Sequence, residues 1–311
     1  MAFFQKIVAF FMSIVAFFTG LFSGGKKPED PTPEPSNPTS YTYYDYAYGS
    51  ESRQRFDLAL PENASGEKGL ILFIHGGAWI AGNKNDYRDA INYASSLGYA
   101  AAALNYRYLS DTVHMDKLME DVASALAKIK SLAAERGVQL NKVLLTGTSA
   151  GAHMSLLYAY HYAPASAIRP VAVVSNCGPT DLCDPAFIEQ NELGNRKTMI
   201  DLMNKVTGVT ISEADYSNHS GQYDAWLAAL RAYSPLTYVT AQTVPTVLGH
   251  GQKDTVVPYA NATALDAALT QQGVRHDFVV FPNSGHALDQ DADASARMNN
   301  LLVQYVQDYL N

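Results

Sequence analysis

The chain has little cysteine, little tryptophan and no cluster of positive charge. Two cysteines and two tryptophans occur among 311 residues, so neither a disulfide framework nor a paired-cysteine metal site can be built. The eight histidines are scattered without ligand spacing, and we expect no metal and no cofactor. A net charge of −8, with no Lys/Arg cluster in the folded part, excludes a typical nucleic-acid-binding surface.

The two cysteines, Cys177 and Cys183, lie close together after one predicted strand. An exported protein could join them in a disulfide, but the loop between them is short. We expect free thiols and no nucleophilic role for either.

The first forty residues differ in composition from the rest. Residues 7–22 form an uncharged run that follows a single lysine, and residues 1–25 therefore resemble an export signal or a membrane anchor. Residues 26–40 are rich in proline and read as an extended spacer. We expect the remaining part, 41–311, to be one folded domain that is secreted or anchored outside the cytoplasm.

The rest of the chain alternates between strand-like and helix-like segments. Two alternating segments, 41–46 and 53–60, predict an opening antiparallel pair. Further strands are predicted at 70–74, 99–104, 143–146, 171–175, 246–249 and 278–281. Helices are predicted at 86–97, 115–135, 260–272 and 294–309. Strands separated by helix-length crossovers indicate an α/β fold with a mostly parallel sheet covered on both faces.

The alternation breaks at 184–233. This insertion carries scattered apolar and aromatic residues among polar ones. Long excursions inside compact domains are usually functional lids, so we expect a small helical cap over the carboxyl edge of the sheet. A peripheral helical decoration is the alternative.

Residues 147–151 read Gly-Thr-Ser-Ala-Gly, directly after a predicted strand and before a helix-like stretch. In that context the pattern G-x-S-x-G predicts a nucleophile elbow, a tight turn that exposes the hydroxyl of Ser149 at a helix N-terminus. The alternative is a glycine-rich turn without chemistry.

A second segment, 75–79, reads His-Gly-Gly-Ala-Trp at the end of the strand 70–74. Adjacent glycines after a strand allow backbone N–H groups to point into a cavity, as stabilisation of an oxyanion requires. His75 is expected to brace this loop, and Gly76 to shape it. Trp79 is expected to wall the substrate pocket, with plain packing as the alternative.

Two titratable residues follow later strands. Asp254 comes after the strand 246–249 and His286 after the strand 278–281, both at carboxyl ends, where ligand sites lie in open α/β sheets. The order Ser149, Asp254, His286 is that of the α/β-hydrolases. His250 is the one rival to His286 as base. Asp181 and Asp184 are possible substitutes for the acid.

Together these segments resemble an α/β-hydrolase of the esterase/lipase branch with an HGG-type oxyanion segment. The resemblance covers about residues 50–311 and includes Asn-Tyr-Arg at 105–107 and Asp-Thr-Val-Val-Pro at 254–258. These motifs indicate the α/β-hydrolase superfamily, but they do not indicate which substrate is hydrolysed. One departure is Ala78, where related lipases have a third glycine; alanine keeps its N–H.

The resemblance and the chemistry imply the same roles. Ser149 is the nucleophile, His286 the base and Asp254 the acid that orients it. The N–H groups of Gly77, Ala78 and Ala150 are the expected oxyanion donors, and the pocket is expected to include Trp79 and Gly76.

The expected activity is hydrolysis of short acyl esters. Similar motif combinations occur in carboxylesterases, in carbohydrate acetyl and feruloyl esterases, and in kynurenine formamidases. The expected partner is therefore a small-molecule or carbohydrate ester, with no nucleic acid, and membrane association is expected only through the N-terminal segment. An arylformamidase-like amidase, a peptidase and a binding module without catalysis are the alternatives.

Overall fold

The computed structural model describes residues 41–189 and 191–311. The two N-terminal predictions, an export signal or anchor at 1–25 and a spacer at 26–40, lie outside the described residues. Within the described part, no helix is both long enough and apolar enough to cross a bilayer.

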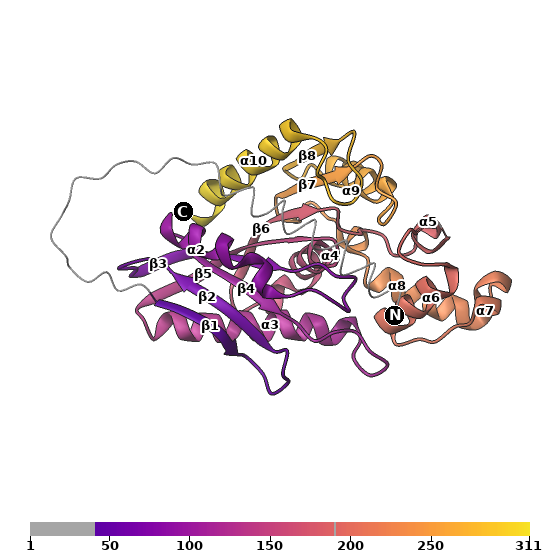
Figure 1. Cartoon of the computed structure of the whole chain (residues 1–311), viewed down its shortest axis with the longest axis horizontal. Coiled ribbons are helices and arrows are strands. Elements are labelled where there is room, and N and C mark those ends of the chain that lie inside the picture. Colours follow the sequence, from indigo (N-terminus) through magenta and orange to yellow (C-terminus); the bar gives the residue numbers. More distant parts are fainter. Residues whose placement is uncertain (1–40, 190) are drawn as a thin grey trace.

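One sheet of eight strands forms the centre of the fold, in the order β1-β2-β4-β3-β5-β6-β7-β8 (Figure 1). The strands β1 and β2 pair antiparallel, and β2 pairs antiparallel with β4. From β4 to β8 all neighbours are parallel. The strands are β1 (Tyr41–Ala47), β2 (Arg55–Leu60), β3 (Gly66–Ile74), β4 (Ala100–Asn105), β5 (Val138–Thr148), β6 (Arg169–Asn176), β7 (Thr246–Gly251) and β8 (His276–Phe281).

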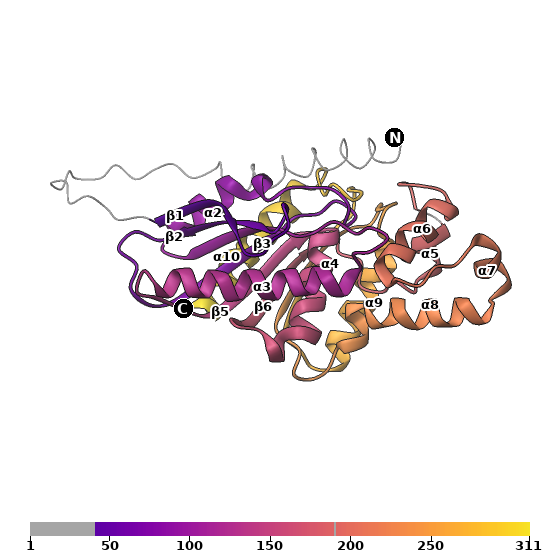
Figure 2. The ribbon, with the colours of Figure 1, turned by 90° about the horizontal axis from the view of Figure 1, so that it is seen from below.

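Helices cover both faces of this sheet (Figures 1 and 2). The helices α3 (Met115–Ala134), α4 (Ala150–Leu157) and α9 (Tyr259–Gln271) contribute to one buried apolar cluster. On the opposite face, α2 (Arg88–Ser96) and α10 (Ala292–Leu310) contribute to a second cluster. The predicted α/β fold with a mostly parallel, doubly covered sheet is therefore confirmed.

Burial on both faces explains the sequence of the central strands. All six residues of β4 are buried, and four of them are consecutive alanines, which allow the helices on both faces to approach closely. The edge strand β1 is instead exposed or half-buried throughout, and its half-buried residues are Tyr41, Tyr43 and Tyr46. Burial thus decides which strands read as continuous apolar runs and which alternate.

Each predicted strand is present, and the main difference is at β5. Its observed bounds, Val138–Thr148, extend five residues before the predicted strand 143–146. The early residues alternate between buried and exposed positions, because only their inward side chains meet the helices.

The described residues of the insertion 184–233 form four helices: α5 (Pro185–Glu189), α6 (Arg196–Thr207), α7 (Glu213–Asn218) and α8 (Gly221–Ala232). They gather at one end of the molecule, on the right in both views (Figures 1 and 2). Ser212 and Asp215 form a reciprocal capping box at the start of α7, and Asn195 caps α6. Local capping therefore defines these helices, and their role as a cap stays a prediction.

Candidate active site

Ser149 lies between the end of β5 and the start of α4, as the G-x-S-x-G pattern predicts. Its backbone angles are φ 56° and ψ −121°, outside the regions that most residues adopt. The Ser149 N–H donates to the carbonyl of Asn176 at the end of β6, 2.8 Å away. Such a strained residue persists only where its surroundings fix it, and the fixed turn presents the side chain at the carboxyl edge of the sheet.

The glycine at position 151 is required by a close approach of two chain segments. A Cβ atom on Gly151 would lie 1.9 Å from the carbonyl oxygen of Ile74, the last residue of β3. The elbow helix α4 therefore begins in direct contact with the strand that leads into the oxyanion segment. The second glycine of the G-x-S-x-G pattern thus fixes the position of Ser149 relative to the oxyanion segment at 75–79.

Asp254 and His286 form a hydrogen-bonded pair. His286 Nδ1 lies 2.7 Å from Asp254 Oδ2, and both side chains are buried. The other carboxylate oxygen, Oδ1, accepts from the N–H groups of Val256 (2.9 Å) and Val257 (2.8 Å). Because Nδ1 faces the acid, Nε2 on the other side of the imidazole is the atom directed to accept a proton.

The acid is held in its ionised form. Burial opposes ionisation, but the neighbouring imidazoles of His286 and His250 outweigh burial and hold the pKa of Asp254 well below its usual range. The ionised carboxylate of Asp254 therefore accepts the hydrogen bond from His286 Nδ1, which is the property that the acid member of a triad needs.

His250 contacts the same carboxylate in a different way. Its Nε2 lies 3.2 Å from Asp254 Oδ2 and 3.0 Å from the carbonyl of Val257. A carbonyl only accepts, so His250 Nε2 carries the proton. It therefore stabilises the turn 254–257 that carries Asp254, which we call the acid loop. His286 makes the shorter contact with the acid, and it does so through Nδ1, which favours His286 over His250 as the base.

Cys177 joins this cluster, which the sequence did not predict. Its thiol donates to the carbonyl of His286 (3.2 Å), and its N–H donates to the carbonyl of Gly249 (2.8 Å). Since Cys177 follows Asn176, which binds the Ser149 N–H, these contacts connect Ser149 to the Asp254–His286 pair. Cys177 directly follows β6 at the carboxyl edge of the sheet, but its local sequence gives no sign of the contact with His286.

The same cluster is the one group of metal-ligand type found among the described residues. One atom each of Cys177, Asp254 and His286 lies within 4.8 Å of the others. Burial raises the pKa of the Cys177 thiol, so the thiolate that a metal needs is disfavoured. Both cysteines are free, as expected, and the donor set fits hydrogen bonding better than metal binding.

The segment after β3 forms a loop with three successive positive φ angles: Gly77 (116°), Ala78 (48°) and Trp79 (59°). A Cβ on Gly77 would lie 2.2 Å from the carbonyl of Ala81, so only glycine fits there. The Gly77 carbonyl accepts from the N–H groups of Ile80 and Ala81, each at 2.9 Å. The positive φ of Ala78 is a conformation that glycine, the residue found here in related lipases, adopts with less strain.

The third predicted oxyanion donor belongs to the elbow. Ala150 is the first residue of α4, and N–H groups in the first turn of a helix have no acceptor within the helix. It directly follows Ser149, as the resemblance requires. Its role, like those of Gly77 and Ala78, stays a prediction.

Trp79 is better explained by packing than by the expected substrate pocket. The side chain is 2% exposed, and its indole Nε1 donates to His153 Nδ1, 3.3 Å away. His153 Nε2 in turn contacts the carbonyl of Tyr233 (2.8 Å). Trp79 has a positive φ, and its ring packs edge-on against the imidazole of His153 on α4, an arrangement that the sequence pattern does not reveal. Both ring nitrogens of His153 are thus bonded within the fold, so His153 is a structural residue.

The other carboxylates after β6 serve local structure. Asp181 Oδ1 accepts from the N–H of Cys183 (2.9 Å), and Asp184 Oδ2 accepts from Asn261 (3.0 Å). Neither contact involves His286. The geometry therefore favours Asp254 over these two residues as the acid.

The insertion meets the acid loop directly. Asn191 Nδ2 donates to the carbonyl of Val256 (2.7 Å), and the Glu192 N–H donates to the carbonyl of Thr255 (2.9 Å). Both acceptors lie in the turn that holds Asp254. The segment before α6 is therefore in contact with the candidate site, which supports the cap interpretation over a remote decoration.

The sheet, the nucleophile elbow and the Asp–His pair at the strand ends define an α/β-hydrolase. The chain belongs to the BD-FAE family, whose model matches residues 56–269. It is 28% identical over 271 residues to the esterase LipQ of Mycobacterium tuberculosis, an alignment that covers 86% of this chain and 61% of LipQ. The chain thus spans less than two thirds of that relative.

Solved structures agree on the fold. Esterase B from Lactobacillus rhamnosis, inhibited in its crystal structure, superposes with a TM-score of 0.69 at 20% identity, covering 99% of this chain and 96% of that one. A truncated carbohydrate esterase from gut microbiota gives a TM-score of 0.64 at 20% identity, covering 86% and 95%. At this identity the likeness shows the fold.

Proposed function

We propose that this protein hydrolyses carboxylic esters through a serine nucleophile. The observation that carries the proposal is the 2.7 Å contact between Asp254 and His286, at the sheet edge that also holds the strained Ser149. The named esterases among its relatives and structural neighbours support the same reaction class.

The proposed mechanism gives each of these groups one role. Ser149 Oγ attacks the acyl carbon while its proton passes to His286 Nε2, and Asp254 stabilises the imidazolium. The negative oxygen of the tetrahedral intermediate is stabilised by the N–H groups of Gly77, Ala78 and Ala150. The intermediate expels the alcohol, which takes the proton from His286. Water then attacks the acyl-enzyme by the same route and releases the acid.

The proposed substrates are esters with short acyl groups, including acyl groups carried by carbohydrates. One structural neighbour is a carbohydrate esterase, and an extracytoplasmic location would bring the enzyme to such polymers. The H-G-G-x-W segment at 75–79 is also found in arylformamidases, which makes an N-formyl amide the second candidate.

A substrate panel tests the proposal. We expect release of nitrophenol from the acetyl and butyryl esters, release of acetate from acetylated xylan, and little turnover of N-formylkynurenine. Turnover of N-formylkynurenine above that of every ester would favour the amidase. No turnover of any substrate by folded protein would favour a binding module.

We further propose that the catalytic domain acts outside the cytoplasm, held by the N-terminal segment. The composition of residues 1–25 and 26–40 supports this. Protease treatment of intact cells should remove the esterase activity. Activity that survives treatment and becomes sensitive only after lysis would contradict the proposal.

A further inference from the structure

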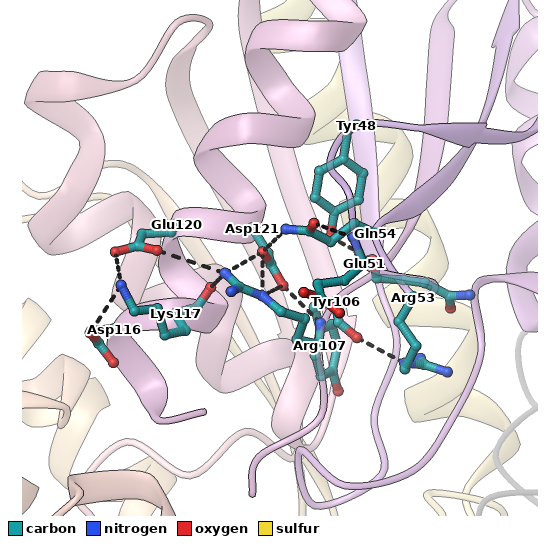
Figure 3. Close-up of polar contacts among 11 residues, drawn as sticks. Tyr48, Glu51, Arg53, Gln54, Tyr106, Arg107, Asp116, Lys117, Glu120 and Asp121 are labelled. Atoms are coloured by element: carbon teal, nitrogen blue, oxygen red, sulfur yellow. Dashed lines mark hydrogen bonds and ion pairs between the residues drawn. The ribbon is translucent and has the colours of Figure 1, made fainter. Parts of the chain in front are cut away.

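The turn between β1 and β2 brings Arg53 onto the oxyanion segment. One guanidinium nitrogen, Nη2, lies 3.2 Å from His75 Nε2 and 3.3 Å from the carbonyl of Gly82. Arg53 Nε donates to the carbonyl of Tyr106 at 2.9 Å (Figure 3). The guanidinium also lies over the ring of Tyr108, 3.6 Å from its centroid. Arg53 therefore contacts both ends of the loop that begins at His75.

A buried ionic network fixes the turn that carries Arg53. Gln54 Nε2 donates to the buried Asp121 at 2.8 Å, and the guanidinium of Arg107 pairs with the same carboxylate at 2.7 Å (Figure 3). The Tyr48 hydroxyl donates to the carbonyl of Asn105 at 2.7 Å. Gln54 directly follows Arg53 in the sequence. These contacts therefore limit the positions that the Arg53 side chain can reach.

The contact with Arg53 determines which nitrogen of His75 carries the proton. A guanidinium has donors only, so His75 Nε2 must accept. In a neutral imidazole the proton is then on Nδ1, which lies 2.7 Å from the carbonyl oxygen of Gly76 and donates to it. Burial lowers the pKa of His75 to about 3, with the charge of Arg53 adding to this effect, so the ring is neutral.

The bond to the Gly76 carbonyl orients the next N–H group. In a trans peptide the C=O of one residue and the N–H of the next point in opposite directions, and no peptide in the described residues is cis. Holding the Gly76 oxygen against His75 therefore directs the Gly77 N–H to the other side of the loop. The Tyr106 hydroxyl donates to the His75 carbonyl (3.0 Å) and secures the preceding peptide.

We propose that Arg53 is a positioning residue, which selects the Nδ1–H tautomer of His75 and thereby aims the Gly77 N–H into the oxyanion hole. The proposal rests on the proposed function of this site, since it presumes an oxyanion at Gly77. With the other tautomer, two acceptors would face each other at His75 Nδ1 and the Gly76 carbonyl. The peptide between Gly76 and Gly77 would then rotate, and the Gly77 N–H would no longer point into the oxyanion hole.

Replacing Arg53 separates this role from simple support of the fold. We expect Arg53→Met to lower kcat by on the order of 10-fold, less than the roughly 10²–10³-fold loss of an oxyanion donor, with KM for nitrophenyl acetate unchanged. Arg53→Lys, which also only donates, should recover part of the loss. Arg55→Met is the control. Arg55 donates to the carbonyls of Glu51 and Gln54 instead of to the oxyanion segment. A raised KM with normal kcat would instead make Arg53 a substrate-binding residue.

A double-mutant cycle tests the route through His75. Asparagine at position 75 can still donate to the Gly76 carbonyl but has no tautomers. In the His75→Asn background, Arg53→Met should therefore reduce kcat much less than it does in the wild type. An equal fold-reduction of kcat by Arg53→Met in the wild-type and His75→Asn backgrounds would overturn the proposal.

The tautomer itself can be observed without any turnover. Long-range ¹H–¹⁵N spectra of labelled protein, with His75 assigned from its loss in His75→Asn, should show Nδ1–H in the wild type and a shift toward Nε2–H in Arg53→Met. A wild-type Nε2–H signal would refute the inference. Because the spectrum needs no substrate, this failure is distinct from a failure of Ser149 to react, which would refute the proposed function.

Discussion

Replacing Ser149 with alanine should lower kcat by about 10⁶-fold, as loss of a triad nucleophile does in serine hydrolases. The substitution removes only Oγ, and the backbone bond from Ser149 to Asn176 remains, so the strained turn is retained. Nitrophenyl acetate hydrolysis by the purified variant measures the loss, with circular dichroism to show that the fold is unchanged.

Ser155→Ala provides the matched control. Ser155 is a buried serine on the same helix α4, and its hydroxyl donates to the carbonyl of Gly151 within that helix (2.8 Å). Its removal should change kcat by only a few-fold, since no reacting group is lost. If Ser149→Ala behaved like Ser155→Ala, the nucleophile would have to be sought elsewhere.

Replacing Asp254 with asparagine should have the second-largest effect, a loss in kcat on the order of 10⁴-fold. An asparagine oxygen can still accept from Val256 and Val257, so the acid loop is preserved. The amide nitrogen, however, would face His286 Nδ1 with a donor, which favours the wrong tautomer of the base. KM should change little, because no contact with the substrate is removed.

Asp184→Asn is the control for this second prediction. Asp184 is the other acidic candidate, and it contacts Asn261 and the start of α5 instead of an imidazole. Parallel kinetics should show a near-normal rate for Asp184→Asn. A larger loss in Asp184→Asn than in Asp254→Asn would reassign the acid.

The sequence predicted the fold because its signals are local. Apolar runs and helix periodicity gave the strands of the sheet and most helix bounds to within a few residues. The elbow was predictable because G-x-S-x-G fell between a strand and a helix, and the glycine at 151 proves to be required by contact with Ile74. The carboxyl ends of parallel strands then placed Asp254 and His286 at the same edge.

The contacts between distant segments could not be predicted in this way. Nothing in the local sequence of Cys177 indicates that its thiol reaches the carbonyl of His286. The bond from Arg53 to His75 likewise depends on how a turn outside the motifs packs on the loop. The choice between the pocket and plain packing for Trp79 could not be made either, because neither its positive φ nor its bond to His153 has a sequence signature.

The most direct test is covalent labelling of the wild-type protein with a fluorophosphonate, followed by peptide mapping. We expect one adduct, on Ser149, that forms on the folded protein and is absent after heat denaturation. We expect no adduct in Ser149→Ala. Absence of labelling on folded wild-type protein, or an adduct on another residue, would rule out Ser149 as the nucleophile.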